Sequence, residues 1–147
     1  MARFTREELQ KRAFFRTAWV LQNFWEEQQD ENPRGTKADV HSRLFDTLVH
    51  EPLILIGKST KGGGHKEHLV PCALIRNRAF EMFHDGKQVE DVAEMIGTFL
   101  RIAHISPDEA RLLDIELKLK TTMPVDWSFE TGSVLSRLEK AGIKLVE

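Results

Sequence analysis

The sequence predicts a mainly α fold with a small β-hairpin, an α+β domain in which helices surround a ββα-like element. Apolar residues recur at helical spacing along most of the chain, and one short apolar run rich in β-branched residues, at residues 53–56, precedes a glycine-rich turn. The 147 residues, of which 41% are hydrophobic and 30% charged, suffice to bury the core of a single domain over residues 1–147.

An aromatic N-terminal helix is predicted over residues 5–31. The Thr-Arg-Glu-Glu run from Thr5 has the pattern of a capping box, and the Asn-Pro-Arg-Gly run from Asn32 is a stop signal. The apolar residues of this helix are Leu9, Phe14, Phe15, Ala18, Trp19, Val20, Leu21, Phe24 and Trp25. They point in more directions than one buried stripe occupies, so a second face needs a cover. We expect a homodimer through this helix; wrapping by later helices of the same chain is the alternative.

The middle of the chain is expected to form the ββα-like element, after a second helix. The predicted order is a helix over residues 36–50, a strand over 53–56, a turn over 58–64, a strand over 65–70 and a helix over 72–84. We expect the two strands to pair as a hairpin, because a short turn rich in Lys and Gly joins them. Pro71 suits the first turn of the following helix, where no amide donor is needed.

The C-terminal part, residues 87–147, is expected to be helical. Apolar residues at i, i+3 and i+4 spacing predict a helix over residues 89–100. The Ser-Pro-Asp-Glu run from Ser106 is a second capping box, with proline at the first helical position. A last helix over residues 133–141 is expected to end at Gly142, since glycine favours the left-handed conformation of a C-cap.

Composition and charge limit the partners and the cellular location that the sequence allows us to expect. The net charge is −2, so a nucleic-acid contact needs a local basic patch. No apolar run reaches the length of a membrane span, and the charged start of the chain lacks the apolar region of a secretory signal. The single cysteine, Cys72, cannot form an internal disulfide, so the expected location is the cytoplasm.

The segment from His65 to Cys72 concentrates imidazole, carboxylate and thiolate groups, which bind metals and move protons. Its core, the Glu-His-Leu-Val-Pro run from Glu67 to Pro71, resembles the acidic-His-aliphatic-x-Pro core of the HNH, or ββα-metal, nucleases. In that family the acidic residue and the histidine lie at the end of the second strand of a hairpin, just before a helix. The order predicted for residues 53–84 is the same.

The resemblance implies a role for each matching residue. Glu67 corresponds to the acidic metal ligand, and His68 corresponds to the general base that deprotonates the attacking water. Asn77 corresponds to the asparagine that positions the histidine, and His84 to the distal residue that completes the metal site. The implied ion is Mg²⁺ or Mn²⁺, which stabilises the leaving 3′-oxygen and the charge on the phosphate.

Two other interpretations of the segment stay open. The first is a tetrahedral Zn²⁺ site, because imidazole and thiolate are zinc donors. Its metal ligands would be His65, His68, Cys72 and His84. The second is structural, with the cysteine as a small buried apolar residue and the glutamate paired with a neighbouring Lys or Arg.

A local basic patch surrounds the motif. Its members, which are the predicted nucleic-acid contacts, are Lys58, Lys61, Lys66, Arg76 and Arg78. These features predict a metal-dependent HNH-like nuclease, or a nuclease-derived domain, that hydrolyses phosphodiesters. The alternative is a small non-enzymatic protein-binding or inhibitor protein of the phage-accessory type, which uses the aromatic helix and holds its histidines structurally or through zinc.

Overall fold

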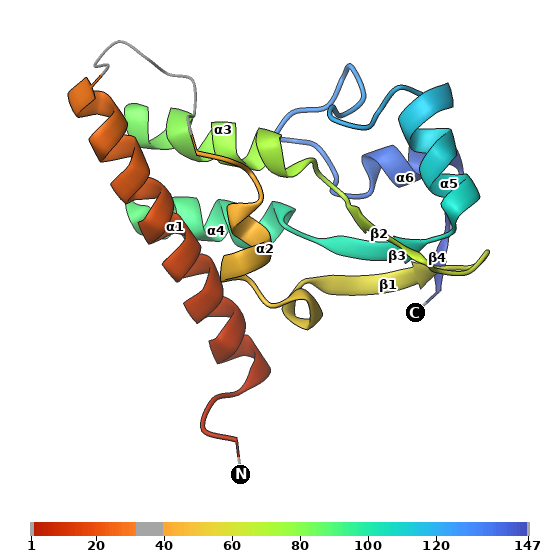
Figure 1. Ribbon diagram of the computed structural model, residues 1–147, viewed down its shortest axis with the longest axis horizontal. Coiled ribbons are helices and arrows are strands. Elements are labelled where there is room, and N and C mark those ends of the chain that lie inside the picture. Colours follow the sequence, from red (N-terminus) through yellow and green to blue (C-terminus); the bar gives the residue numbers. More distant parts are fainter. Residues whose placement is uncertain (1, 32–39, 147) are drawn as a thin grey trace. The chain divides into compact units, whose positions relative to one another are not determined.

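The computed structural model describes residues 2–31 and 40–146 (Figure 1). The chain divides into two compact units, one formed by Met1–Ile54 and Cys72–Thr98 and the other by Leu55–Pro71 and Phe99–Glu147. Within the described ranges, no helix is long and apolar enough to cross a membrane. The predicted mainly α architecture with a small sheet is confirmed, and a single domain over the whole chain stays a prediction.

The first unit is helical. Its elements are α1 Arg6–Glu31, α2 Leu44–Leu48, the 3₁₀ turn η1 Glu51–Leu53, α3 Cys72–His84 and α4 Val89–Phe99, whose last residue belongs to the second unit. The helices predicted over residues 5–31, 72–84 and 89–100 are confirmed. Thr5 caps α1 as expected, because its hydroxyl oxygen accepts the Glu8 amide at 3.1 Å.

The helix predicted over residues 36–50 is shorter in the part that is described, where it spans Leu44–Leu48. His41 Nδ1 accepts the amide of Arg43 at 3.0 Å just before this helix begins. A side chain that bonds a neighbouring amide offers the backbone an alternative to the helix. Residues 36–39 of that prediction, and the stop signal over residues 32–35, lie outside the described residues.

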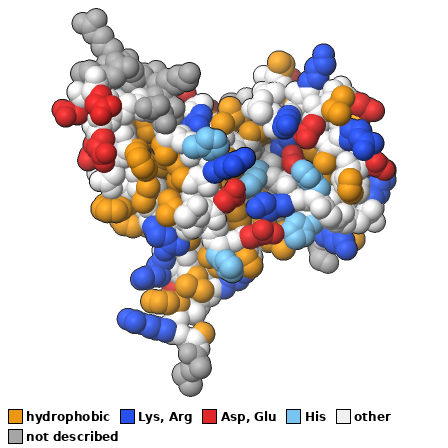
Figure 2. All heavy atoms as spheres, in the orientation of Figure 1, with side chains coloured by type: hydrophobic (Ala, Val, Ile, Leu, Met, Phe, Trp, Pro, Cys, Tyr) orange, Lys and Arg blue, Asp and Glu red, His pale blue; other side chains and the backbone are white. Residues whose placement is uncertain are grey.

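Helix α1 buries one side and exposes another. Phe14 and Leu21 are buried, and Gly97 of α4 lies so close that a Cβ atom there would be 2.9 Å from the Phe14 ring. Phe15 and Trp19, on a different side of the helix, are 44% and 54% exposed. Figure 2 shows hydrophobic side chains at the surface along the middle of α1. The predicted second aromatic face is therefore present.

The second unit contains a four-stranded sheet. Its elements are β1 Leu55–Ser59, β2 His65–His68, β3 Ile102–Ile105, α5 Pro107–Arg111, the π-helical turn η2 Leu112–Glu116, α6 Ser136–Ala141 and β4 Leu145–Val146. The strand order is β2-β3-β1-β4. Strand β3 is antiparallel to β2 and parallel to β1, and β4 is antiparallel to β1.

The predicted hairpin between the strands at residues 53–56 and 65–70 is wrong, because β3 lies between β1 and β2. The expectation of helices alone over residues 87–147 is also wrong at β3 and β4. Three of the four residues of β3 are buried, which is typical of a central strand. The insertion of the buried strand β3 between β1 and β2 therefore prevents the hairpin that the local sequence favours. Two strands and a helix still follow one another along the chain, but the two strands are not paired.

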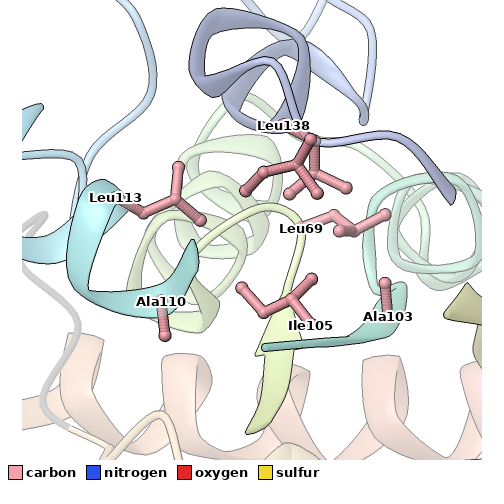
Figure 3. Packing of buried hydrophobic residues seen from close by; sticks show 7 residues of the cluster. Leu69, Ala103, Ile105, Ala110, Leu113 and Leu138 are labelled. Atoms are coloured by element: carbon pink, nitrogen blue, oxygen red, sulfur yellow. The ribbon is translucent and has the colours of Figure 1, made fainter. Parts of the chain in front are cut away.

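The core of the second unit lies on one face of the sheet, called the inner face below (Figure 3). Its buried members are Leu69, Ala103, Ile105, Ala110, Leu113, Leu138 and Ile143. The predicted capping box of α5 is confirmed: Ser106 Oγ accepts the Glu109 amide at 3.2 Å, and Glu109 Oε1 accepts the Ser106 amide at 2.9 Å. Gly142 ends α6 with φ 71°, as predicted.

Candidate functional site

Strand β2 divides the predicted motif between the two faces of the sheet. Successive side chains of a strand point to opposite faces, and Glu67 is in register with Ala103 of the inner-face core. His65 and Glu67 therefore lie on the inner face, and Lys66 and His68 lie on the opposite, outer face. The two residues that the HNH resemblance treats as a pair, Glu67 and His68, point away from each other.

Glu67 is a buried carboxylate held by a buried arginine. Arg137 Nη2 of α6 donates to Glu67 Oε1 at 2.8 Å, and the two residues are 1% and 8% exposed. The same guanidinium donates to the carbonyl oxygens of Leu119 at 2.8 Å and His68 at 2.7 Å. Removal of either charge would leave the other buried without its partner, so this pair fixes α6 against β2.

His65 contacts the second oxygen of the Glu67 carboxylate. His65 Nε2 lies 3.0 Å from Glu67 Oε2, and the His65 side chain is 41% exposed. Both oxygens of Glu67 thus have nitrogen partners, and Arg137 already supplies the positive charge that a metal ion would bring. Within residues 2–31 and 40–146, no group of three or more His, Cys, Asp or Glu could hold a metal ion. These residues do not fit the Mg²⁺, Mn²⁺ or Zn²⁺ centres that the sequence suggested.

The helical residues of the predicted site belong to the first unit. Asn77 Oδ1 accepts a hydrogen bond from Arg76 Nε at 3.1 Å. His84 is the exposed last residue of α3, about 10 Å along the helix from Asn77. Cys72, the first residue of α3, is half-buried. The roles of Asn77 and His84 beside the motif stay predictions.

The predicted basic patch is divided between the units. Arg76 and Arg78 of α3 have local partners: Arg76 Nη1 donates to the Val40 carbonyl at 3.1 Å, and Arg78 Nη1 lies 3.4 Å from a carboxylate oxygen of Glu81. The three lysines, Lys58, Lys61 and Lys66, belong to the second unit.

The outer face of the sheet carries a row of basic side chains. Lys66 of β2 is in register with His104 of β3, and His104 is in register with Lys58 of β1. These three residues, called the basic row below, share one face because directly opposed residues point the same way. Both lysines are exposed and His104 is half-buried. His68 lies on the same face, one step further along β2.

The glycine-rich loop between β1 and β2 lies next to the basic row. A Cβ atom on Gly63 would be 3.4 Å from Lys58 Cε and 3.4 Å from His104 Cβ. Without a side chain at this position, the backbone approaches both residues closely. The loop therefore forms one border of the basic surface.

Glu109 anchors the start of this loop from the inner face. Its Oε2 accepts the Ser59 hydroxyl at 2.8 Å, and the Ser59 oxygen accepts the Lys61 amide at 3.1 Å. Burial raises the pKa of Glu109, but hydrogen bonds from Ser106 and Ser59 and the charge of Lys61 outweigh burial, so the pKa lies below its usual value of 4.5. The carboxylate is therefore ionised where it fixes the loop.

Two residues of this region, His104 and Arg137, are not predicted by the sequence. His104 lies in the C-terminal part that the sequence predicts to be helical, and the local signal for a strand there is limited to the β-branched residues Ile102 and Ile105. Arg137 lies 70 positions from Glu67, and no local pattern predicts that pair. Helix α6 also carries Glu139 and Lys140, so the sequence does not distinguish Arg137 from a surface residue.

Comparison with known proteins assigns no family to this geometry. Searches of protein-family models, of curated proteins and of solved structures found no match. The function therefore has to be inferred from the residues of the sheet and of the exposed helix.

Proposed function

We propose that this chain is an HNH-like, nuclease-derived domain that binds a phosphodiester backbone on the outer face of its sheet. The basic row supports this proposal most directly. Two lysines and a histidine lie in three neighbouring strands, whose backbones span about 10 Å across the sheet. The two lysine ammonium groups attract phosphates, and the glycine-rich loop beside them lets a backbone approach.

His68 is the proposed base for hydrolysis, because it shares the outer face with the basic row. Its imidazole takes a proton from a water molecule while the water oxygen attacks phosphorus. The bond from phosphorus to the leaving 3′-oxygen breaks, and that oxygen takes a proton from solvent. The charge that builds on the phosphate is stabilised by Lys58 and Lys66. Glu67 has no part in this step, since it faces Arg137.

The requirement for Mg²⁺ or Mn²⁺ is a separate prediction of the HNH resemblance. Because the two oxygens of Glu67 are engaged by Arg137 and His65, no step of the proposed hydrolysis depends on a metal held there. Activity measured with Mg²⁺, with Mn²⁺, with Zn²⁺ and with a chelator decides whether an ion is needed.

A cleavage assay on single- and double-stranded oligonucleotides tests the proposal. We expect His68→Ala to abolish cleavage and to leave binding and the melting temperature unchanged, since a methyl group cannot accept a proton. The control is His50→Ala, an exposed histidine of the first unit, which should cleave as the unmodified chain does. Binding of oligonucleotides without cleavage would exclude hydrolysis and would support a nuclease-derived domain that only binds nucleic acid. Absence of binding to every oligonucleotide would remove the proposal altogether.

The second candidate function is non-enzymatic protein binding through α1. The observation that favours it is the exposure of Phe15 and Trp19, at 44% and 54%. Aromatic side chains are common anchors of protein interfaces. The two functions use different units of the chain, so loss of one activity by mutation should leave the other intact.

A further inference from the structure

We infer that Arg137 of α6 is a positioning residue for the proposed base, because its guanidinium holds the backbone at His68. This inference rests on the proposed hydrolysis and names a residue that acts only through His68. Arg137 and His68 both belong to the second unit. The arginine lies on the inner side of the sheet, so it touches neither the phosphodiester nor the attacking water on the outer face.

The carbonyl group of His68 lies at an edge of the sheet. Strand β2 comes first in the order β2-β3-β1-β4, so within the described sheet it pairs with β3 alone. In an antiparallel pair, the backbone groups of successive residues point alternately towards the partner strand and away from it. The Leu69 amide points towards β3, because it donates to the Arg101 carbonyl at 2.9 Å. The His68 carbonyl therefore points away from β3 and requires a donor from outside the sheet.

Arg137 supplies this donor. Its Nη1 donates to the His68 carbonyl oxygen at 2.7 Å, and the positive charge makes this bond stronger than one from a neutral group. Two further bonds hold the same guanidinium, from Nη2 to Glu67 Oε1 at 2.8 Å and from Nε to the Leu119 carbonyl oxygen at 2.8 Å. Arg137 is 1% exposed, so water does not compete for these bonds. The planar group is fixed by its partners and fixes the His68 carbonyl in turn.

The neighbours of both residues are fixed by the core. Leu69 follows His68, Leu138 follows Arg137, and both leucines are buried members of the inner-face core (Figure 3). Arg137 Nη1 also lies 3.5 Å from the Leu69 carbonyl oxygen. The backbone at His68 is therefore held by the arginine and by the core. Because the backbone sets the direction of the Cα–Cβ bond, these contacts aim the His68 imidazole at the outer face.

The rate of hydrolysis depends on this aim. A general base has to lie within about 2.6–3.2 Å of the atom whose proton it takes. A displacement of about 1 Å, even one caused by a distant substitution, lowers a rate by about a hundredfold. Without the Arg137 bond the His68 backbone would shift, whereas Lys58 and Lys66 would still attract phosphates. We therefore expect loss of this contact to lower kcat and to leave KM nearly unchanged.

Steady-state cleavage by Arg137→Lys tests the inference, at a temperature where denaturation curves show every variant to be folded. Lysine keeps a positive charge but lacks the planar fork that reaches the His68 carbonyl, Glu67 and Leu119 together. We expect kcat to fall roughly tenfold or more. The matched control is Leu113→Ala, which destabilises the same core by opening a cavity and leaves the guanidinium in place. Its kcat should equal that of the unmodified chain.

A second variant keeps the test decisive if Arg137→Lys does not fold. Glu67→Gln retains the size of the side chain and an oxygen acceptor, but removes the charge that holds the guanidinium. Arg137 should then hold the His68 carbonyl less firmly, so kcat should fall less than in Arg137→Lys but below that of Leu113→Ala. A kcat equal to that of the control would contradict the positioning role.

The outcomes separate the positioning role from the proposed function. Absence of cleavage by the unmodified chain would overturn both. Cleavage by Arg137→Lys with an unchanged kcat would overturn the positioning role alone. An equal fall of kcat in Leu113→Ala would do the same, because stability and not the contact with His68 would then determine the rate. A higher KM at an unchanged kcat would also contradict it, since Arg137 would then serve binding.

Discussion

The two faces of the four-stranded sheet use charge in opposite ways, although the same strands build both. On the inner face, Glu67 is buried and each of its oxygens has a nitrogen partner. On the outer face, Lys66 and Lys58 stand exposed on either side of His104. Neighbouring residues of one strand thus differ in role. The inner charges are buried and paired, whereas the outer lysines are exposed, and it is these lysines that we propose to contact phosphates.

The largest effect is expected from Arg137→Met. The substitution removes one partner of a buried pair and leaves Glu67 charged in the core, so we expect a loss of about 3–5 kcal/mol in the free energy of unfolding. Urea denaturation measures it, with Arg111→Met, an exposed arginine of α5, as the control. A loss below about 1 kcal/mol would show that the inner pair does not stabilise the unit.

A double variant tests whether the charges of Glu67 and Arg137 interact. Glu67→Gln combined with Arg137→Met removes both charges, so it should be more stable than Arg137→Met alone. If the two substitutions destabilise additively, the charges do not interact as their 2.8 Å contact implies.

A smaller loss, about 1–2 kcal/mol at neutral pH, is expected from Glu109→Gln, because the ionised carboxylate accepts bonds from Ser59 and Ser106. The pKa of Glu109 is lower in the folded chain than in the unfolded chain. The contribution of the Glu109 carboxylate to the free energy of unfolding is therefore fully present when the pH lies above the pKa of the unfolded chain, near 4.5. It is lost as the pH falls through the lower pKa of the folded chain. The stability difference between the two proteins should be constant near neutral pH and should shrink below pH 4.5. A difference that grows on acidification would contradict this account.

The smallest effect on stability is expected on the outer face. Lys58→Ala together with Lys66→Ala should change the free energy of unfolding by less than about 0.5 kcal/mol per residue, because exposed lysines contribute little to packing. Denaturation curves of this variant and of the unmodified chain should nearly superimpose. A large loss would mean that the outer lysines, like the inner pair, serve the fold.

The features of the fold that could be predicted from the sequence are those that depend on residues close together in the chain. The caps at Thr5 and Ser106, the ends of α3 and the glycine stop at Gly142 all depend on residues a few positions apart, and all are confirmed. The strand order was not predicted, since β3 pairs with segments more than 30 positions away. For the same reason the sequence placed Glu67 in a metal site, whereas its partner is Arg137.

The salt dependence of nucleic-acid binding tests the central claim most directly. Fluorescence anisotropy with a labelled duplex, repeated at several KCl concentrations, gives the slope of log K against log salt. If the outer face contacts phosphates, Lys58→Ala/Lys66→Ala should make this slope shallower by about 2, roughly 1 for each lysine. The control Lys87→Ala/Lys120→Ala removes two exposed lysines elsewhere and should keep the original slope. Equal slopes for the three proteins would contradict binding of phosphodiesters on the basic row.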